Sequence, residues 1–257
     1  MDLLNRMADF NAARDTALHR LEQFAPFAGK TYREERNFDY GPQDRSNVSV
    51  LSPHIRHRLI TEEEIVRRVL ADKSLSTVEK FVQEILWRTY WKGWSEQRPE
   101  VWRRYATSRD FQIDLVENNG GLRKAHDRAL DANTGIDCFD AWVTELLETG
   151  YLHNHARMWF ASIWIFTLRL PWQLGADFFL RHLMDGDAAS NTLSWRWVAG
   201  LQTRGKTYLA RHSNIQKFYA GRFSPEGLST QAHPLDDAPF EKPLMPELNA
   251  GFAEPGA

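Results

Sequence analysis

Apolar residues recur at intervals of three and four over much of the chain, and this spacing predicts a run of amphipathic helices. The first such face lies within 8–24 and consists of Phe10, Ala13, Ala17, Leu21 and Phe24. A second face predicts a helix over 76–94. Between these two segments, Ser52-Pro53 predicts a short helix with proline at its start, and Thr61 with Glu64 forms a capping box for a helix that runs to about Leu70.

The second half of the chain predicts four more helices. They cover 137–148, ending at Gly150; 154–170, stopped by Pro171; 176–183; and 188–200. The polar stretches 30–47 and 97–133 are expected to be irregular, with Gly41-Pro42 and Asn119-Gly120-Gly121 as breakers. No segment alternates with period two, so the predicted fold class is all-α. We expect one helical domain over 1–222 and a proline-rich arm over 223–257.

Composition narrows the class of protein. The chain of 257 residues has no signal-peptide pattern and no apolar run of transmembrane length, which predicts a cytoplasmic protein with no membrane partner. A single cysteine, Cys138, excludes an intramolecular disulfide and a four-cysteine metal or iron–sulfur site. The net charge of −2 requires any DNA binding to come from a local basic patch. Ten tryptophans and fifteen phenylalanines suit a core or the walls of a flat cofactor.

The most informative stretch is 147–197, which combines a polar motif with an apolar helix. Arg157 lies within a run of Met, Trp, Phe, Ile and Leu, where an unpaired guanidinium would be costly, so it needs a carboxylate partner. The motif residues, in order, are Thr149, Gly150, Tyr151, His153, Asn154, Arg157, Met158, Asp185, Gly186, Asp187, Ala189, Asn191, Trp195 and Trp197. This ordered set resembles the FAD-binding domain of the photolyase/cryptochrome family, and it implies that multi-helix all-α fold with FAD as the cofactor.

The resemblance implies roles for the residues around the flavin. Arg157 and Asp185 would form a pair beside the ring; the alternative is an ion pair that serves only the fold. Asp187, which follows Gly186 in the motif, would contact the polar edge of the flavin, and Asn191 would face its redox-active N5.

The resemblance extends upstream to a phosphate-binding segment. That segment consists of Val48, Ser49, Val50, Leu51 and Ser52, with Val48 standing where the family usually has threonine. Backbone amides and serine hydroxyls of this kind suit a pyrophosphate, although the segment alone is also typical of a plain helix cap. Tyr32 would lie near the cofactor, and Arg36 would face DNA phosphate.

A helical segment that contains Glu84, Trp87 and Arg88 resembles the lesion-binding helix of photolyases. There the Glu would hydrogen-bond a flipped-out pyrimidine dimer, and Trp87 would stack against it together with Trp197. Asn154 and Met158 fit the same pocket. The chain departs from the family at His155, which replaces an arginine on the DNA-facing rim, and it lacks the family's Phe-Asn-Pro, near which Arg211 is a plausible basic residue.

Trp195 and Trp172 match the two tryptophans nearest the flavin in the family's photoreduction chain. The third tryptophan has no clean counterpart, and Trp102 and Trp164 are the candidates. A metal site is not expected, because His153 and His155 are two residues apart on a helix and diverge by roughly 200°.

The family's N-terminal antenna domain has no counterpart, so we expect a chain without an antenna. The leading hypothesis is a deoxyribodipyrimidine photolyase-like lyase, in which light drives an electron from reduced FAD to a cyclobutane pyrimidine dimer in damaged DNA. One alternative is a cryptochrome-like blue-light sensor whose C-terminal arm responds to photoreduction. The other is a flavin protein with dark redox chemistry or a purely structural cofactor. A separate signalling or antenna partner would be compatible with the absence of an antenna domain.

Overall fold

The computed structural model describes residues 12–235, and within that range it contains helices and no strands. The first part of the chain forms α2 (Arg14–Phe24), the 3-10 helix η1 (Ala25–Phe27), α3 (Lys30–Glu35), α4 (Ser52–Arg56), α5 (Glu62–Asp72) and α6 (Leu75–Glu96). The second part forms α7 (Pro99–Asn118), α8 (Gly120–Leu130), α9 (Asp137–Thr149), α10 (Asn154–Ser162), the π-helix η2 (Ile163–Thr167), α11 (Trp172–His182), α12 (Ala188–Val198) and α13 (His212–Phe218). The predicted all-α fold class is confirmed.

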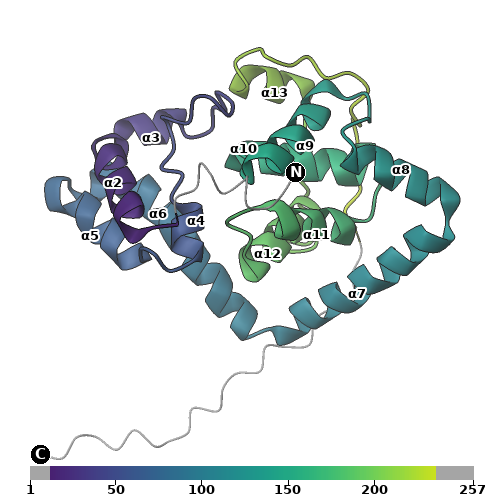
Figure 1. The fold of residues 1–257 in the computed structure, drawn as a ribbon, viewed down its shortest axis with the longest axis horizontal. Coiled ribbons are helices and arrows are strands. Elements are labelled where there is room, and N and C mark those ends of the chain that lie inside the picture. Colours follow the sequence, from purple (N-terminus) through teal and green to yellow (C-terminus); the bar gives the residue numbers. More distant parts are fainter. Residues whose placement is uncertain (1–11, 236–257) are drawn as a thin grey trace, which may run out of the picture.

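The helices build two lobes, each with its own hydrophobic core. The N-terminal lobe, α2 to α6, is centred on residues such as Phe24, Ile65 and Phe81, and the larger C-terminal lobe, α7 to α13, on buried rings such as Trp159 and Trp195. Figure 1 shows the long helices α6 and α7 meeting along the lower edge and joining the lobes. Hydrogen bonds and ion pairs connect the facing sides of the lobes.

Local signals set several helix ends as predicted. The capping box forms at the start of α5, where the Thr61 hydroxyl accepts from the Glu64 amide at 3.2 Å and the Glu64 carboxylate accepts from the Thr61 amide at 2.9 Å. Gly150 ends α9 in the left-handed conformation, with a φ of 66° that suits glycine. No helix within the described range is both long and apolar enough to cross a membrane.

The prediction of an irregular segment over 97–133 is wrong, because this segment forms α7 and α8. Helix α7 buries only Val101, Tyr105 and Val116, so its apolar face is too sparse to be recognised by periodicity. The breaker at 119–121 marks the junction between the two helices, where the side chain of Asn119 accepts from the Leu122 amide at 3.0 Å and caps α8.

Other helix boundaries also differ from the predictions. Residues 30–35 form α3 instead of opening an irregular stretch, and α11 begins at Trp172, four residues before the predicted start. The helix predicted over 154–170 changes to π geometry at Ile163 and ends at Thr167, two residues before Arg169, which has a φ of 55°. Helix α13 was not predicted.

The predictions at the two ends of the chain are only partly covered. Helix α2 starts at Arg14, and the earlier part of the predicted helix, 8–11, lies outside the described residues. In the predicted arm, residues 223–235 contain no helix, and 236–257 lie outside the described residues.

The close contact between Gly175 on α11 and Trp195 on α12 gives a test of how these two helices pack. A β-carbon at Gly175 would collide with the ring of Trp195 and press on Trp164. Gly175→Ala is therefore expected to lower the free energy of unfolding by about 1–3 kcal/mol, as overpacking does in other cores. Urea unfolding measures the effect.

The matched control is Gly93→Ala on α6, where a β-carbon meets nothing within 4 Å. Alanine there is expected to leave stability unchanged or to raise it by up to about 1 kcal/mol. Equal stability of the Gly175→Ala and wild-type proteins would contradict the packing described.

Candidate functional site

The two lobes meet at the DGD loop, Asp185-Gly186-Asp187, which joins α11 to α12. Arg157 on α10 forms a bidentate pair with Asp185, with Nη1 to Oδ1 and Nη2 to Oδ2 both at 3.0 Å. The Nε of Arg157 also donates to the Leu152 carbonyl at 2.9 Å, which fixes the plane of the guanidinium. The carboxylate partner expected for Arg157 is therefore Asp185.

Asp185 also contacts the N-terminal lobe. Its side chain is buried and accepts a hydrogen bond from Ser52, the first residue of α4. Burial alone would raise the pKa of Asp185, but the charge and hydrogen bonds of Arg157, the Ser52 hydroxyl and the charge of Arg88 together hold the pKa below its usual value. The group is therefore a carboxylate at neutral pH, fixed between α10 and α4.

Gly186 allows the loop to pass close to the end of α11. A β-carbon at this position would come within 2.9 Å of the Leu180 carbonyl oxygen and 3.0 Å of that of Leu183. The carbonyl of Gly186 accepts a hydrogen bond from Arg56 Nε of α4 at 2.8 Å, which adds a second contact between the lobes. Only glycine fits here without displacing backbone.

Asp187 is surrounded by positive charge. One oxygen caps α12 by accepting from the Ser190 amide at 3.0 Å. The other oxygen lies 3.8 Å from Arg56 Nε, 3.8 Å from Lys92 Nζ and 4.0 Å from Arg88 Nη1. Three cations therefore converge on one carboxylate, and the buried Nη1 of Arg88 has no hydrogen-bond partner among residues 12–235. This excess of positive charge, with an unsatisfied donor, suits a ligand that carries phosphate.

The segment from Val48 to Ser52 turns sharply as it enters α4. Val50 has a φ of 50°, an unusual conformation for a β-branched residue that implies local strain. Arg20 Nη1 donates to the Val50 carbonyl at 3.2 Å, and the Ser49 hydroxyl accepts from the Leu51 amide at 3.4 Å. The predicted phosphate segment thus lies beside Asp185, to which Ser52 is bonded.

Tyr32 and Arg36, both predicted from the resemblance, lie along one side of α6. The ring of Tyr32 is buried against Phe24 and Phe81, with centroids 5.9 and 5.1 Å away. Arg36 pairs with Glu84 at 2.9 Å. Glu84 also pairs with Lys80 at 2.9 Å, so the carboxylate predicted to meet the lesion is held by two cations and stays 28% exposed.

Asn191 and Trp195 both lie on the buried side of α12, next to α11. The amide nitrogen of Asn191 donates to the Ala176 carbonyl at 2.7 Å, which fixes the side chain between the two helices. Trp195 is 2% exposed and packs edge-on against Phe179 and Trp164, at centroid distances of 5.2 and 6.3 Å. Trp172 begins α11 and is also buried.

Two tryptophans that were predicted to stack on DNA are exposed. Trp87 on α6 is 45% exposed and stacks on Trp91 at 5.3 Å, and Trp197 on α12 is 37% exposed and stacks on Tyr208 at 5.7 Å. Helices α6 and α12 pack against each other. A cavity of about 450 Å³ adjoins Tyr208, and Arg211 and Asn214 are among its lining residues.

Asn154 and Met158, the other residues predicted at the lesion pocket, lie on α10 beside His155. Asn154 is exposed and Met158 half-buried. His155, by contrast, is buried: Nδ1 bonds the Asn37 carbonyl and Nε2 bonds the Tyr208 hydroxyl, both at 2.9 Å, and burial lowers its pKa. The position thus links α10 to both lobes, and a direct contact of His155 with DNA stays a prediction.

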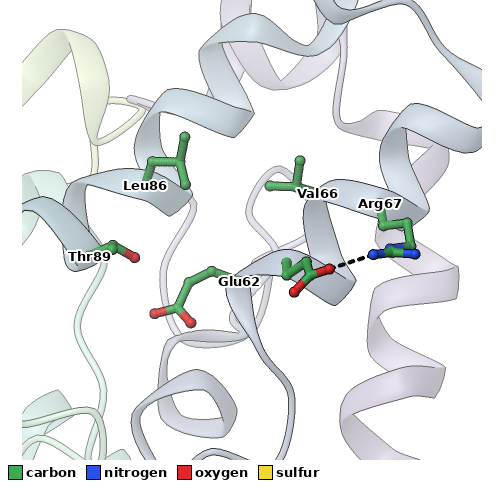
Figure 2. Close-up of a pocket in the computed structure, with 6 residues that line it drawn as sticks. Glu62, Val66, Arg67, Leu86 and Thr89 are labelled. Carbon is green, nitrogen blue, oxygen red and sulfur yellow. Dashed lines mark hydrogen bonds and ion pairs between the residues drawn. The ribbon is translucent and has the colours of Figure 1, made fainter. Parts of the chain in front are cut away.

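A groove of about 440 Å³ lies between α5 and α6. Figure 2 shows Leu86 and Thr89 on one side of it and Val66 on the other. Leu86 is two residues from both Glu84 and Arg88, so it points about 200° around the helix from them. The groove therefore opens on the side of α6 that faces away from the DGD loop.

Comparison with known proteins identifies this arrangement. A sequence model described as the FAD binding domain of DNA photolyase matches residues 81–228, more than half of the chain. The chain belongs to this family. The matched range includes the DGD loop, Arg157 and both exposed tryptophans, so FAD is the cofactor of the domain.

Curated relatives agree with this assignment. The chain is 26% identical over 255 residues to the mitochondrial deoxyribodipyrimidine photo-lyase of Saccharomyces cerevisiae, covering 91% of this chain and 43% of that protein. It is 30% identical over 249 residues to that of Agrobacterium fabrum, covering 91% and 50%, and 36% identical over 161 residues to that of Streptomyces griseus, covering 61% and 33%. The chain thus spans between a third and a half of the length of these relatives.

Solved structures show the same fold. A bacterial class III photolyase from Agrobacterium tumefaciens superposes with a TM-score of 0.63 at 27% identity, covering 80% of this chain and 42% of that one. A cryptochrome from Synechocystis superposes with a TM-score of 0.65 at 22% identity, covering 84% and 45%.

The residues present fit FAD. Arg88, Arg56 and Lys92 would hold its pyrophosphate, since they provide positive charge and an unsatisfied buried donor. The Arg157–Asp185 pair would lie at its ring. The sequence analysis did not single out Arg56 or Lys92, and it assigned Arg88 to DNA. The spacing of Arg88 and Lys92, four apart on one helical face, was the available signal.

Removing the charge of Asp185 is expected to destabilise the fold. In Asp185→Asn the guanidinium of Arg157 loses its counter-charge, and breaking a buried pair in this way reduces the free energy of unfolding by about 3–5 kcal/mol. The folded pKa of Asp185 lies below its unfolded value, so its stabilisation is present above about pH 4 and is lost as the pH falls through the folded pKa. The difference in the free energy of unfolding between wild type and variant should therefore become smaller as the pH falls.

Urea unfolding at a series of pH values measures this gap. Asp114→Asn, at an exposed position on α7, is the matched control and should change stability by no more than about 0.5 kcal/mol. A gap for Asp185→Asn that stays constant from pH 7 to acid would contradict the assigned pKa shift.

The cation cluster predicts how FAD is held. Arg88→Gln and Lys92→Gln each remove one charge next to Asp187, and each should weaken FAD binding roughly tenfold, the effect of about 1.4 kcal/mol. Titration of the apoprotein with FAD measures the affinity. Lys124→Gln on the exposed surface of α8 removes the same charge elsewhere and should leave the affinity unchanged. Equal affinities of all three variants would refute the role of the cluster.

Proposed function

We propose that this protein is a photolyase-like lyase that binds FAD and uses light to split cyclobutane pyrimidine dimers in DNA. One observation supports this most strongly: two exposed tryptophans, Trp87 and Trp197, lie on packed helices that also carry the residues expected to hold FAD. Arg88 directly follows Trp87, and Asp187 caps the helix of Trp197. Cofactor and stacking surface therefore share the same two helices.

The exposed rings supply the surface on which a flipped-out lesion would stack. A damaged base pair is less costly to open than an intact one, and aromatic stacking recovers about 1–3 kcal/mol per base. Asn154 and Met158 at the start of α10 complete the proposed pocket. When bound, reduced FAD supplies the electron that light excites.

Glu84 is proposed to accept hydrogen bonds from the extruded bases. Its pairs with Arg36 and Lys80 orient it along the side of α6 that Trp87 shares. Arg36 is 22% exposed, so its guanidinium remains available at its outer edge to DNA phosphate. Arg211, on the rim of the cavity beside Tyr208, is placed to do the same. The proposal assigns to these two arginines the local positive charge that DNA binding by a chain with a net charge of −2 needs.

A sensor or redox role shares the cofactor but not the need for a stacking surface. The exposure of Trp87 and Trp197 favours repair, since exposed apolar side chains that gather on one surface are typical of binding sites. The arm to which a sensor role was assigned lies mostly outside the described residues. A cytoplasmic location and a separate antenna or signalling partner stay predictions.

Repair is tested by illuminating photoreduced protein with a dimer-containing oligonucleotide, with an identical sample kept in the dark. Dimers should be lost only in light. Trp197→Ala removes one stacking partner and should weaken binding of the damaged strand by about 1–3 kcal/mol, which corresponds to roughly fivefold to 150-fold. Quantifying intact dimers and measuring oligonucleotide affinity give the two results.

Trp94→Ala is the matched control. Trp94 is also on α6, but its ring packs under Arg98, whereas Trp87 stacks on Trp91. It should repair at the wild-type rate. A flavin that photoreduces normally while dimers persist would refute the repair function and leave the sensor and redox alternatives.

A further inference from the structure

Helix α7 carries two aromatic residues that the function proposed above does not use. Tyr105 is buried in the C-terminal core, with 1% of its surface exposed, whereas Trp102, one helical turn earlier, is 38% exposed. Helix α7 packs on α11, which brings both rings towards Trp172. The resemblance made Trp102 one of two candidates for the third tryptophan, and it gave Tyr105 no role.

The rings of Trp172, Tyr105 and Trp102 contact one another in series from the core to the surface, and we call this series the ladder. The centroids of Trp172 and Tyr105 are 5.4 Å apart with planes inclined at 33°, and those of Tyr105 and Trp102 are 5.3 Å apart at 44°. Both distances are within the range of rings in direct contact. On the inner side, Trp195 packs against Gly175, which lies one turn along α11 from Trp172.

The two residues on α7 differ in what they can do with a proton. The Tyr105 hydroxyl is buried and has no hydrogen-bond partner among the described residues, and burial, together with Asp177, raises its pKa. Oxidation of a tyrosine expels the phenolic proton, and no base is hydrogen-bonded to this hydroxyl within residues 12–235. Tyr105 is therefore suited to pass an electron between Trp102 and Trp172, and not to hold a long-lived radical itself. The indole of Trp102 reaches solvent, where water takes its proton.

Trp164, the other candidate for the third tryptophan, does not reach the surface. It is fully buried, and its indole nitrogen donates to the Pro171 carbonyl at 2.9 Å. It contacts Trp195 edge-on at 6.3 Å, which makes it a neighbour of the path and not its outer end.

We propose that Trp102 is the solvent-side end of an electron path that runs through Tyr105 and Trp172 to Trp195 and serves photoreduction of the flavin. One electron leaves Trp102 and refills oxidised Trp172, and the Trp102 cation radical gives its indole proton to water. An external thiol then returns a hydrogen atom to Trp102, and two thiyl radicals combine to a disulfide. The inference rests on the FAD binding of the proposed function but not on repair.

The test is flash excitation of the FAD-loaded protein, with the tryptophanyl radical followed by transient absorption. Wild type should give a long-lived deprotonated radical that thiol quenches. Trp102→Phe should lose this signal and decay by fast recombination. Tyr105→Phe, which keeps the bridging ring, should retain the radical, and Tyr105→Leu should lose it. Trp94→Phe, which replaces a tryptophan outside the ladder, is the matched control and should behave as wild type.

Several outcomes separate this inference from the repair function. A long-lived radical in Trp102→Phe, or none in wild type, would overturn the path. Trp102→Phe that is reduced chemically should still repair dimers at the wild-type rate, because the path is needed only to reduce the flavin. Loss of the radical in Trp102→Phe with no repair by any protein would support the path and refute repair. Unchanged FAD content and near-ultraviolet circular dichroism confirm that each variant is folded.

Discussion

The structure depends on the buried carboxylate of Asp185, which holds together two lobes that have separate hydrophobic cores. Arg157 binds it from the C-terminal lobe through two hydrogen bonds of 3.0 Å, and Ser52 binds it from α4 of the N-terminal lobe. Because this carboxylate is buried, its charge is tolerable only while those partners stay in place. The same carboxylate therefore takes part both in a contact between the lobes and in the candidate site.

The same loop also positions α12, the helix that follows it. Gly186 brings the backbone against the end of α11, and Asp187 then starts α12 as its cap. The buried Trp195 and the exposed Trp197 are two residues apart on that helix, so they point in nearly opposite directions. A single helix thus presents one indole to the interior, where electrons would travel, and another to solvent, where a base would stack.

The sequence alone predicted the parts of this arrangement that depend on residues close together in the chain. The capping box at Thr61, the glycine end of α9 and the ordered motif around Arg157 depend on residues close in sequence, and the structure has them. Helix α7 escaped prediction because most of its surface faces solvent, which leaves few apolar positions to show a period. The convergence of Arg56 with Lys92 on Asp187 and the bonds of His155 to both lobes are tertiary, and sequence spacing does not contain them.

The small number of buried side chains on α7 also explains how the proposed electron path can reach the surface along this helix. A helix that anchors itself with few buried side chains leaves most positions free of packing demands, so an indole at position 102 can sit half in solvent without opening the core. Tyr105 then has two roles, since the ring that fastens α7 to Trp172 is also the ring that bridges to Trp102. The oxidised end of the path would lie on α7, whereas the proposed lesion surface is on α6 and α12. The radical would therefore rest on an indole other than the two that are proposed to stack on the bases.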